Sequence, residues 1–99
     1  MARFDVYTNR AGNGYLLDVQ SDLLSGLNTR VVIPLLTADV APQPADRLNP
    51  VFEVEGTQVV MATQFMAAIP EPELTAPAGN LASRQAEISA ALDMLFLGF

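Results

Sequence analysis

Short stretches that alternate apolar and polar residues fill the first part of the chain and predict β-strands. Phe4 to Thr8 and Tyr15 to Val19 are rich in strand-forming side chains, and Gly12-Asn13-Gly14 between them offers the positive φ angles of a turn. We therefore expect a hairpin. Thr29 to Leu36 is the most continuous apolar run and predicts a central strand, in which Pro34 must face an edge or a bulge because it has no N–H.

The middle of the chain predicts a long loop followed by a second hairpin. Thr37 to Pro50 contains several prolines and few large apolar residues, which indicates a loop, with one helical turn at Ala45 to Leu48. Val51 to Val54 and Thr57 to Thr63 are strand-like and flank Glu55-Gly56, a dipeptide that makes tight turns.

The stretch from Leu81 to Phe99 predicts a helix that runs to the end of the chain. Asn80 or Ser83 can cap its first turn, and Gly98 is the residue type that ends helices, because it takes the left-handed conformation without a Cβ clash. At about 100° per residue, one stripe of apolar side chains suits a core. This stripe contains Ile88, Ala91, Leu92, Leu95 and Phe96.

Met94 and Leu97 fall on the opposite side of this helix. A helix lying on a small domain has no use within its own chain for apolar residues there, so we expect both to contact a second copy of the chain. In an alternative arrangement, the terminal tripeptide folds beneath the sheet. The whole pattern predicts one domain, residues 1–99, that is mainly β with one C-terminal α-helix. Its antiparallel sheet is expected to be SH3-barrel-like or split, with about five to seven short strands.

The composition narrows the chemistry available to the chain. The net charge is −6 and no lysine is present, a balance that repels phosphate backbones and argues against unaided binding of DNA or RNA. Histidine and cysteine are also absent, which removes the usual general bases, thiol nucleophiles and zinc ligands. We therefore expect no enzyme, no metal site and no cofactor. Without a run of about 18 apolar residues or a signal-peptide pattern, we expect a cytoplasmic protein that does not enter a membrane.

Two short stretches after the first hairpin are candidates for function. Asp18 and Asp22 flank Gln20-Ser21 where a strand gives way to a loop, so solvated carboxylates, or a capping role for Asp22, are expected rather than a metal site. Leu23-Leu24 lies between polar and turn-prone residues. One of these leucines is a candidate surface contact, and the burial of both stays open.

Six blocks of the chain stand in an order that is typical of a known family. They are Val6-Tyr7-Thr8, Asp18-Val19-Gln20-Ser21-Asp22 with two aliphatic residues after it, Val32-Ile33-Pro34-Leu35, Leu48-Asn49-Pro50-Val51, Met61-Ala62-Thr63, and Met94-Leu95-Phe96-Leu97-Gly98-Phe99. Together they resemble the CcdB family of bacterial toxin–antitoxin toxins, from Phe4 to Phe99.

The resemblance implies a CcdB/MazF-type toxin fold in a homodimer, with a five-stranded antiparallel sheet, a smaller three-stranded sheet and a terminal helix. It also implies a function, because the family toxin binds the A subunit of DNA gyrase and traps the gyrase–DNA cleavage complex. A cognate CcdA-like antitoxin neutralises such a toxin, and the pair represses its own operon. DNA would then be met only through the antitoxin complex.

The resemblance also assigns residues by position. It places the gyrase contact on Leu23, Leu24, Asp93, Leu97, Gly98 and Phe99. It places the antitoxin over part of the long loop and over the first hairpin loop, on Thr8, Asn9, Arg10, Ala11, Gly12, Asn13 and Gly14. The family's best-known member has tryptophan at the position of Leu97 and asparagine at that of Asp93, and tryptophan is the residue most enriched among binding hot spots.

Two alternatives to a gyrase poison remain open from the sequence. One is a dimeric interaction protein that keeps the fold and has lost the poison through Leu97. The other is an endoribonuclease toxin of related fold, which would use hydroxyl groups and arginines such as Arg10 or Arg30.

Overall fold

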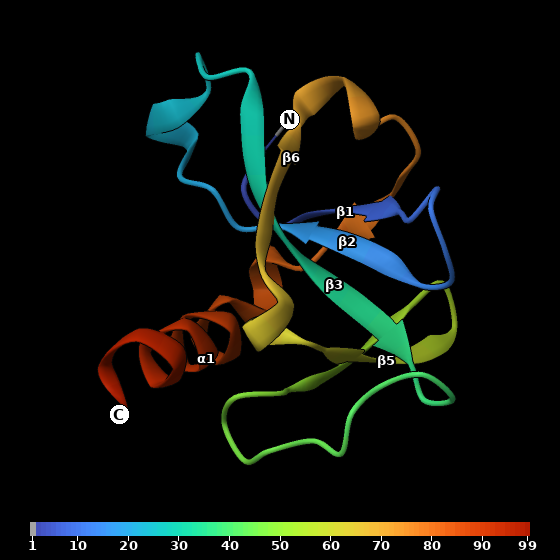
Figure 1. Ribbon diagram of the computed structural model, residues 1–99, viewed down its shortest axis with the longest axis vertical. Helices are drawn as coiled ribbons and strands as arrows, with labels where there is room; N and C mark the ends of the chain where they lie inside the picture. Colours follow the sequence, from blue (N-terminus) through green and yellow to red (C-terminus); the bar gives the residue numbers. More distant parts are fainter. Residues whose placement is uncertain (1) are drawn as a thin grey trace.

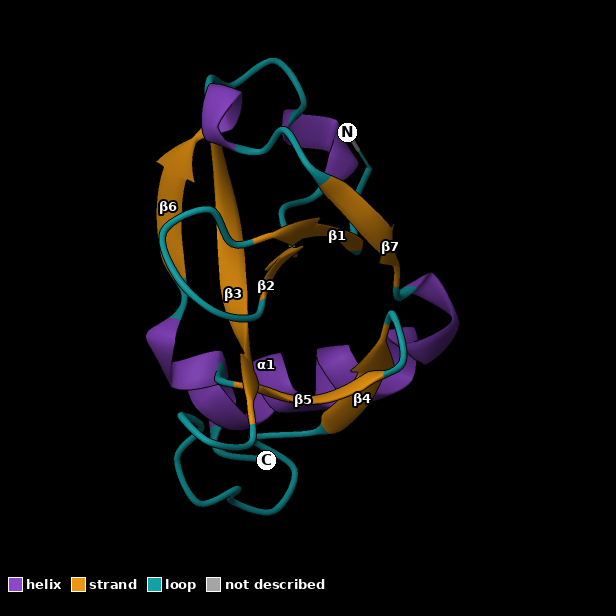
Figure 2. Ribbon diagram, turned by 90° about the vertical axis from the view of Figure 1, so that its right-hand side faces the viewer, coloured by secondary structure: helices purple, strands orange, loops and turns teal. Residues whose placement is uncertain are grey.

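Seven strands form one curled antiparallel sheet in the computed structural model, which describes residues 2–99 (Figure 1). The strands are β1 (Asp5–Thr8), β2 (Tyr15–Asp18), β3 (Thr29–Thr37), β4 (Val51–Val54), β5 (Thr57–Met61), β6 (Ala67–Pro70) and β7 (Pro77–Asn80), and the helix is α1 (Gln85–Leu97). Short 3₁₀ turns lie between them: η1 (Asp22–Leu24), η2 (Thr63–Phe65), η3 (Glu71–Glu73) and η4 (Ala82–Arg84). The order across the sheet is β4-β5-β3-β2-β1-β7, and β6 also pairs with β3. Figure 2 shows the strands curving into a partial barrel, with α1 beside β4 and β5.

Both predicted hairpins are confirmed. β1 and β2 pair antiparallel, and Gly14 has a φ of 88° at the end of the loop that joins them. A Cβ at Gly14 would collide with the backbone oxygen of Leu35, so both space and conformation require glycine there. β4 and β5 pair across Glu55 (φ 51°) and Gly56 (φ 79°), whose two left-handed conformations suit a two-residue hairpin turn.

β3 is the central strand, as predicted, and on one side it changes partner at Pro34. Residues 29–32 pair with β6 and residues 35–37 pair with β5, while β2 pairs along the other side. The Ala62 N–H donates to the Pro34 carbonyl (2.9 Å), on the side where β6 gives way to β5. The nitrogen and the carbonyl of one strand residue point to the same side, so the N–H that proline lacks falls between the two partner strands. One sheet, not two, results because β3 belongs to both of its halves.

The main core lies inside the curl of the sheet. Strands β1 to β5 and the helix supply its fully buried side chains, among them Leu17, Ile33, Leu35, Phe52, Met61, Ile88 and Ala91. Tyr7, Val32 and Leu74 form a smaller cluster. Tyr7 and Val32 are sequence neighbours of Val6 and Ile33 in the main core, so this second cluster covers the opposite face of β1 and β3.

α1 follows the sequence pattern in its first turns and departs from it in its last. Ile88 and Ala91 are buried and Leu92 packs against the core, as predicted. Leu95, however, is 36 % exposed and Phe96 is 68 % exposed. The prediction that Phe96 packs on the core is wrong, because the helix projects beyond the strands that cover its beginning (Figure 1).

The two ends of α1 differ in how well the sequence predicts them. Gly98 ends the helix as predicted, with a φ of 82°. The start was placed too early, because α1 begins at Gln85 after the η4 turn and no side chain caps it. The Ala82 N–H donates to Asn80 Oδ1 (2.7 Å), so Asn80 supports η4 instead, and Ser83 lies within that turn. The sequence also gave no sign of β7, whose Pro-Ala-Gly-Asn composition is that of a loop.

Candidate functional site

The last turn of α1 and the residues after it form an exposed apolar surface, which we call the terminal surface. It consists of Leu95, Phe96, Leu97 and Phe99, and Leu97 and Phe99 are 60 % and 74 % exposed. The Gly98 N–H donates to the carbonyls of Asp93 (3.1 Å) and Met94 (3.2 Å), which ends the helix and carries Phe99 out of its path. The terminal tripeptide therefore does not fold beneath the sheet. A contiguous group of large apolar side chains at a surface marks an interaction site more often than chance exposure does.

A second exposed apolar surface lies on the Leu23–Leu24 turn, residues 21–28. Leu23 is 94 % exposed and Leu24 is 48 % exposed, so both leucines reach solvent where the sequence left open the burial of both. Ser21 Oγ accepts a hydrogen bond from the Leu23 N–H (3.2 Å) and so begins the η1 turn. No residue of η1 is buried, which means that core packing does not hold these leucines in place.

A buried ion pair lies at the base of the strands that this turn connects. Arg30 Nη2 is 2.7 Å from Asp18 Oδ2, and Arg30 Nε donates to the same oxygen (2.8 Å). The prediction of a solvated Asp18 is wrong, because the side chain is completely buried. Burial raises the pKa of the Asp18 carboxyl above its usual range, and the hydrogen bond and charge of Arg30 oppose that rise.

Asp22 does not take the capping role that the sequence suggested. Its Oδ1 accepts a hydrogen bond from the Arg3 N–H (2.8 Å), which fastens the turn to the chain just before β1. Arg3 Nε in turn donates to the Val19 carbonyl (3.0 Å). The Leu23–Leu24 turn and the end of the preceding strand are thus both connected to Arg3.

The two exposed apolar surfaces lie far apart within one chain. Figures 1 and 2 place η1 toward one end of the long axis and the C-terminal end of α1 toward the other. All six residues that the sequence assigned to a gyrase contact are exposed, but Leu23 and Leu24 lie on one surface and Asp93, Leu97, Gly98 and Phe99 lie on the other. A single chain therefore does not bring them together.

The first hairpin loop, residues 8–14, lies between two hollows. Asn9, Arg10 and Ala11 line one of about 390 Å³, together with Leu16, Ile69 and Glu73. Thr8, Gly12, Asn13 and Gly14 line part of the other, of about 450 Å³. Arg10 Nη1 donates to Thr75 Oγ1 (3.2 Å), and the exposed guanidinium lies at the rim of the first hollow. The seven residues assigned to an antitoxin contact are thus accessible at least in part.

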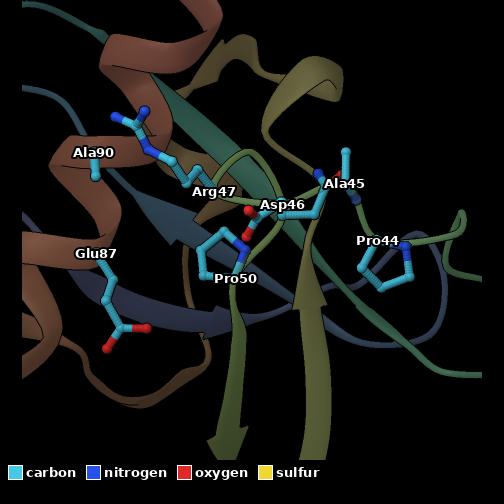
Figure 3. Close-up of a pocket in the computed structure, with 8 residues that line it drawn as sticks. Pro44, Ala45, Asp46, Arg47, Pro50, Glu87 and Ala90 are labelled. Carbon is cyan, nitrogen blue, oxygen red and sulfur yellow. The ribbon is translucent and has the colours of Figure 1, made fainter. Parts of the chain in front are cut away.

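The long loop and α1 enclose a hollow of about 560 Å³ that the sequence did not reveal (Figure 3). Pro44, Asp46 and Arg47 line it from the loop, and Glu87 and Ala90 line it from the helix.

A buried amide holds this part of the loop in place. The Asn49 N–H donates to the Ala45 carbonyl (3.0 Å) and closes a turn. The predicted helical turn at Ala45 to Leu48 is nevertheless wrong, because Arg47 has a φ of 66° and no helix forms there. The Asn49 side chain accepts from the Ala45 N–H (3.0 Å) and donates to the Met61 carbonyl (3.0 Å). In the Leu48-Asn49-Pro50-Val51 block, the asparagine therefore has a structural role, because its side chain holds the loop against β5.

Over the described part of the chain, residues 2–99, the positive charges are scattered and do not form a groove. Arg30 is buried, Arg84 pairs with Glu87, and Arg3 lies over the ring of Phe4. The hydrogen bond from Arg84 lowers the pKa of Glu87. Across residues 2–99, no three histidine, cysteine, aspartate or glutamate side chains are grouped so as to hold a metal ion. Over the same residues, no helix is both long enough and apolar enough to span a bilayer.

Comparison with known proteins shows which family and which solved structures the chain is similar to. The family model described as "CcdB protein" matches residues 3–98. A solved structure titled "Endoribonuclease from Mycobacterial species" is similar over 100 % of this chain and 92 % of that chain, with a TM-score of 0.77 and 16 % identity. Another, titled "Endoribonuclease in complex with its cognate antitoxin from Mycobacterial species", covers 100 % and 96 % with a TM-score of 0.75 and 18 % identity. At these identities the likeness shows a common fold.

A curled antiparallel sheet with one C-terminal helix is thus a fold that this chain shares with an endoribonuclease solved in complex with its cognate antitoxin. The chain belongs to the CcdB family, as its sequence blocks indicated.

The prediction that the chain is not an enzyme is contradicted, because proteins with this fold over the whole chain are named endoribonucleases. The absence of histidine, cysteine and lysine was therefore the wrong criterion for excluding enzymatic activity. Hydroxyl groups, carboxylates and arginine remain for chemistry.

Proposed function

We propose that this toxin binds the A subunit of DNA gyrase and traps the gyrase–DNA cleavage complex. The single observation that carries the proposal is the terminal surface, where Leu97 and Phe99 stand free of the core at the end of the chain. Large apolar side chains presented in this way are suited to fill pockets on a partner, and such central contacts supply most of the binding energy of an interface. Asp93 and Gly98 complete this surface, and Leu23 and Leu24 form the second one.

The proposal includes a homodimer. Met94 and Leu97 lie on the last turns of α1, and we propose that a second copy covers part of them. Two copies related by a twofold axis would present each surface twice to a target that is itself twofold. Doubling of the contacts would strengthen the binding without any new kind of contact.

The proposal also includes a cognate CcdA-like antitoxin. Residues 8–14 and the long loop both border hollows, and a peptide of the antitoxin would lie over them. The complex of the two proteins would repress their operon, so that DNA contact would come through the antitoxin. Gyrase and this complex would place the toxin in the cytoplasm.

The test is a cleavage-complex assay with gyrase from the host of this chain. We expect purified protein to increase the linear DNA trapped by gyrase, and we expect Phe99 deletion to abolish this increase without loss of folding. If the wild-type protein at micromolar concentration leaves both supercoiling and cleavage-complex levels unchanged, the gyrase assignment fails.

A second candidate function is that of an endoribonuclease, and the observation that favours it is the fold shared with proteins of that name. Arg30 cannot contact RNA, because it is 1 % exposed and paired with Asp18. Arg10 is exposed at the edge of a hollow beside Asn9, so its guanidinium could reach a phosphate. Incubation with single-stranded RNA tests this function. Sequence-selective cleavage that Arg10→Ala abolishes would support it, whereas RNA that stays intact would exclude it.

A further inference from the structure

The block Asp18-Val19-Gln20-Ser21-Asp22 precedes the two exposed leucines, and the proposed function uses only the leucines. Asp18 and Gln20 are nevertheless buried, with Asp18 0 % and Gln20 7 % exposed. Polar side chains are rarely buried unless hydrogen bonds satisfy them, so the partners of these two residues show what the block holds in place.

Gln20 connects the Leu23–Leu24 turn to the central strand. Its Nε2 donates to the Leu24 carbonyl (3.2 Å), and its Oε1 accepts from the Val31 N–H (3.1 Å). The Gln20 side chain is therefore hydrogen-bonded both to the exposed Leu24 and to Val31 in β3. Since no η1 residue is buried, this bridge and the hydrogen bond between Asp22 and Arg3 take the place of apolar packing in fixing the turn.

The bridge is itself held by the buried ion pair. The Gln20 N–H donates to Asp18 Oδ1 (3.0 Å), while Asp18 Oδ2 accepts from Arg30 Nε (2.8 Å). Both carboxylate oxygens are thus engaged, and the backbone of Gln20 is fixed relative to β3. A continuous series of hydrogen bonds runs from Arg30 through Asp18 and Gln20 to Leu24.

We propose that Gln20 is a positioning residue for the contact surface of Leu23 and Leu24, and that the Asp18–Arg30 pair fixes Gln20. The proposal rests on the proposed function in so far as these leucines contact the target. An exposed turn without a bridge would sample many conformations, and a target would have to order it on binding, which costs affinity. Gln20 removes this cost beforehand.

The experiment compares Gln20→Glu with a matched control. Gln20→Glu keeps an oxygen that can accept from the Val31 N–H and loses only the donor to the Leu24 carbonyl. Thr63→Val serves as the control, because Thr63 is also buried and donates to a loop carbonyl, that of Leu48, far from both leucines in the chain. Gln20→Met, which carries no charge, shows whether an effect of Gln20→Glu comes from repulsion alone.

The first readout is amide hydrogen exchange in the folded protein. The N–H groups of Leu24, Ser25 and Leu27 bond within the turn, to Ser21, Asp22 and Leu24 respectively. We expect Gln20→Glu to speed exchange at these three amides about tenfold, the effect of losing one hydrogen bond, while the rest of the sheet is unchanged. Gln20→Met also loses the acceptor for the Val31 N–H, so we expect it to speed exchange at least as much and to affect Val31 as well. We expect Thr63→Val to leave the three amides unchanged. Unchanged exchange in the Gln20 variants would overturn the proposal.

The second readout is affinity for the gyrase A subunit. Gln20→Glu should weaken binding by about tenfold in the wild-type background and should have no further effect when Leu23→Ala and Leu24→Ala are already present. An equal loss in both backgrounds would overturn the proposal, because Gln20 would then act independently of the leucines. If the wild-type protein does not bind gyrase, the proposed function fails, and the exchange result alone decides the role of Gln20.

Discussion

Arg30 and Asp18 form an ion pair of 2.7 Å in which the two side chains are 1 % and 0 % exposed. The guanidinium does not have all the partners it could use, since Arg30 Nη2 meets the carboxylate at ion-pair distance without the geometry of a hydrogen bond. Such a pair gives little net stability, because moving both charges out of water costs about as much as their attraction returns. Its value lies in fixing one arrangement of the strands and of the turn between them.

Asp18→Asn should lower the free energy of unfolding by about 3 to 5 kcal/mol, because it leaves the Arg30 charge buried without a counter-charge. The double variant Asp18→Leu/Arg30→Met removes both charges and should cost clearly less. Urea unfolding followed by circular dichroism measures both values. A double variant that is less stable than Asp18→Asn would contradict this account of the pair.

Gly14→Ala should destabilise the protein more than Gly56→Ala does. Both glycines have positive φ, so alanine at either position carries the cost of a left-handed residue, about 1 to 3 kcal/mol. Only at Gly14 would the new methyl group also collide with the Leu35 carbonyl, whereas Gly56 has open space. Thermal unfolding of the two variants gives the comparison, and equal losses would show that the β1–β2 loop moves away without cost.

Leu97→Trp should strengthen the terminal surface as a binding site and leave the fold unchanged. Leu97 is 60 % exposed, so a larger side chain meets no core atoms. Tryptophan contacts at an interface are commonly worth about 2 kcal/mol or more, which corresponds to about thirtyfold in affinity. Titration against the gyrase A subunit measures the gain, and Leu97→Ala should change affinity in the opposite direction. A tryptophan variant that binds no better than wild type would show that Leu97 does not lie in the contact.

The two tyrosines should titrate above their ordinary pKa of about 10. Burial is the main cause for Tyr7, and the hydrogen bond that Tyr15 Oη donates to Glu55 Oε1 (3.0 Å) is the main cause for Tyr15. A phenol whose pKa is higher in the folded state stabilises the fold below pH 10, and this stability is lost as the pH rises through the folded pKa. Stability should therefore fall above pH 10.

Ultraviolet titration can test this directly, because the chain has two tyrosines and no tryptophan. Glu55→Gln should lower the pKa of Tyr15 toward 10 and leave that of Tyr7 unchanged. Tyr7→Phe should flatten the alkaline loss of stability. A titration in which Glu55→Gln moves neither tyrosine would show that the Tyr15–Glu55 bond does not persist in solution.

Sequence reasoning predicted the elements that local chemistry determines. The β4–β5 turn follows from Glu55-Gly56, the end of α1 follows from Gly98, and the central place of β3 follows from its apolar run. In each case the deciding information lies within a few neighbouring residues, whether as a turn dipeptide, a flexible glycine or continuous burial.

The features that the sequence missed depend on contacts between distant segments. β7 is a strand only because its backbone pairs with β1, and nothing in Pro77 to Asn80 favours that conformation by itself. Asp18 looked solvated because its partner Arg30 comes twelve residues later, in another strand. Phe96 shares the stripe of Ile88 and Ala91 and still lies outside, because helix periodicity does not reveal where the neighbouring strands stop.

Because β1 pairs with β7, with Asp5 opposite Asn80, the outer edge of β1 stays unpaired until a segment 75 residues further along the chain has been made. The sheet therefore cannot close while the ribosome still holds the C-terminal part, and pairings between such distant segments form slowly.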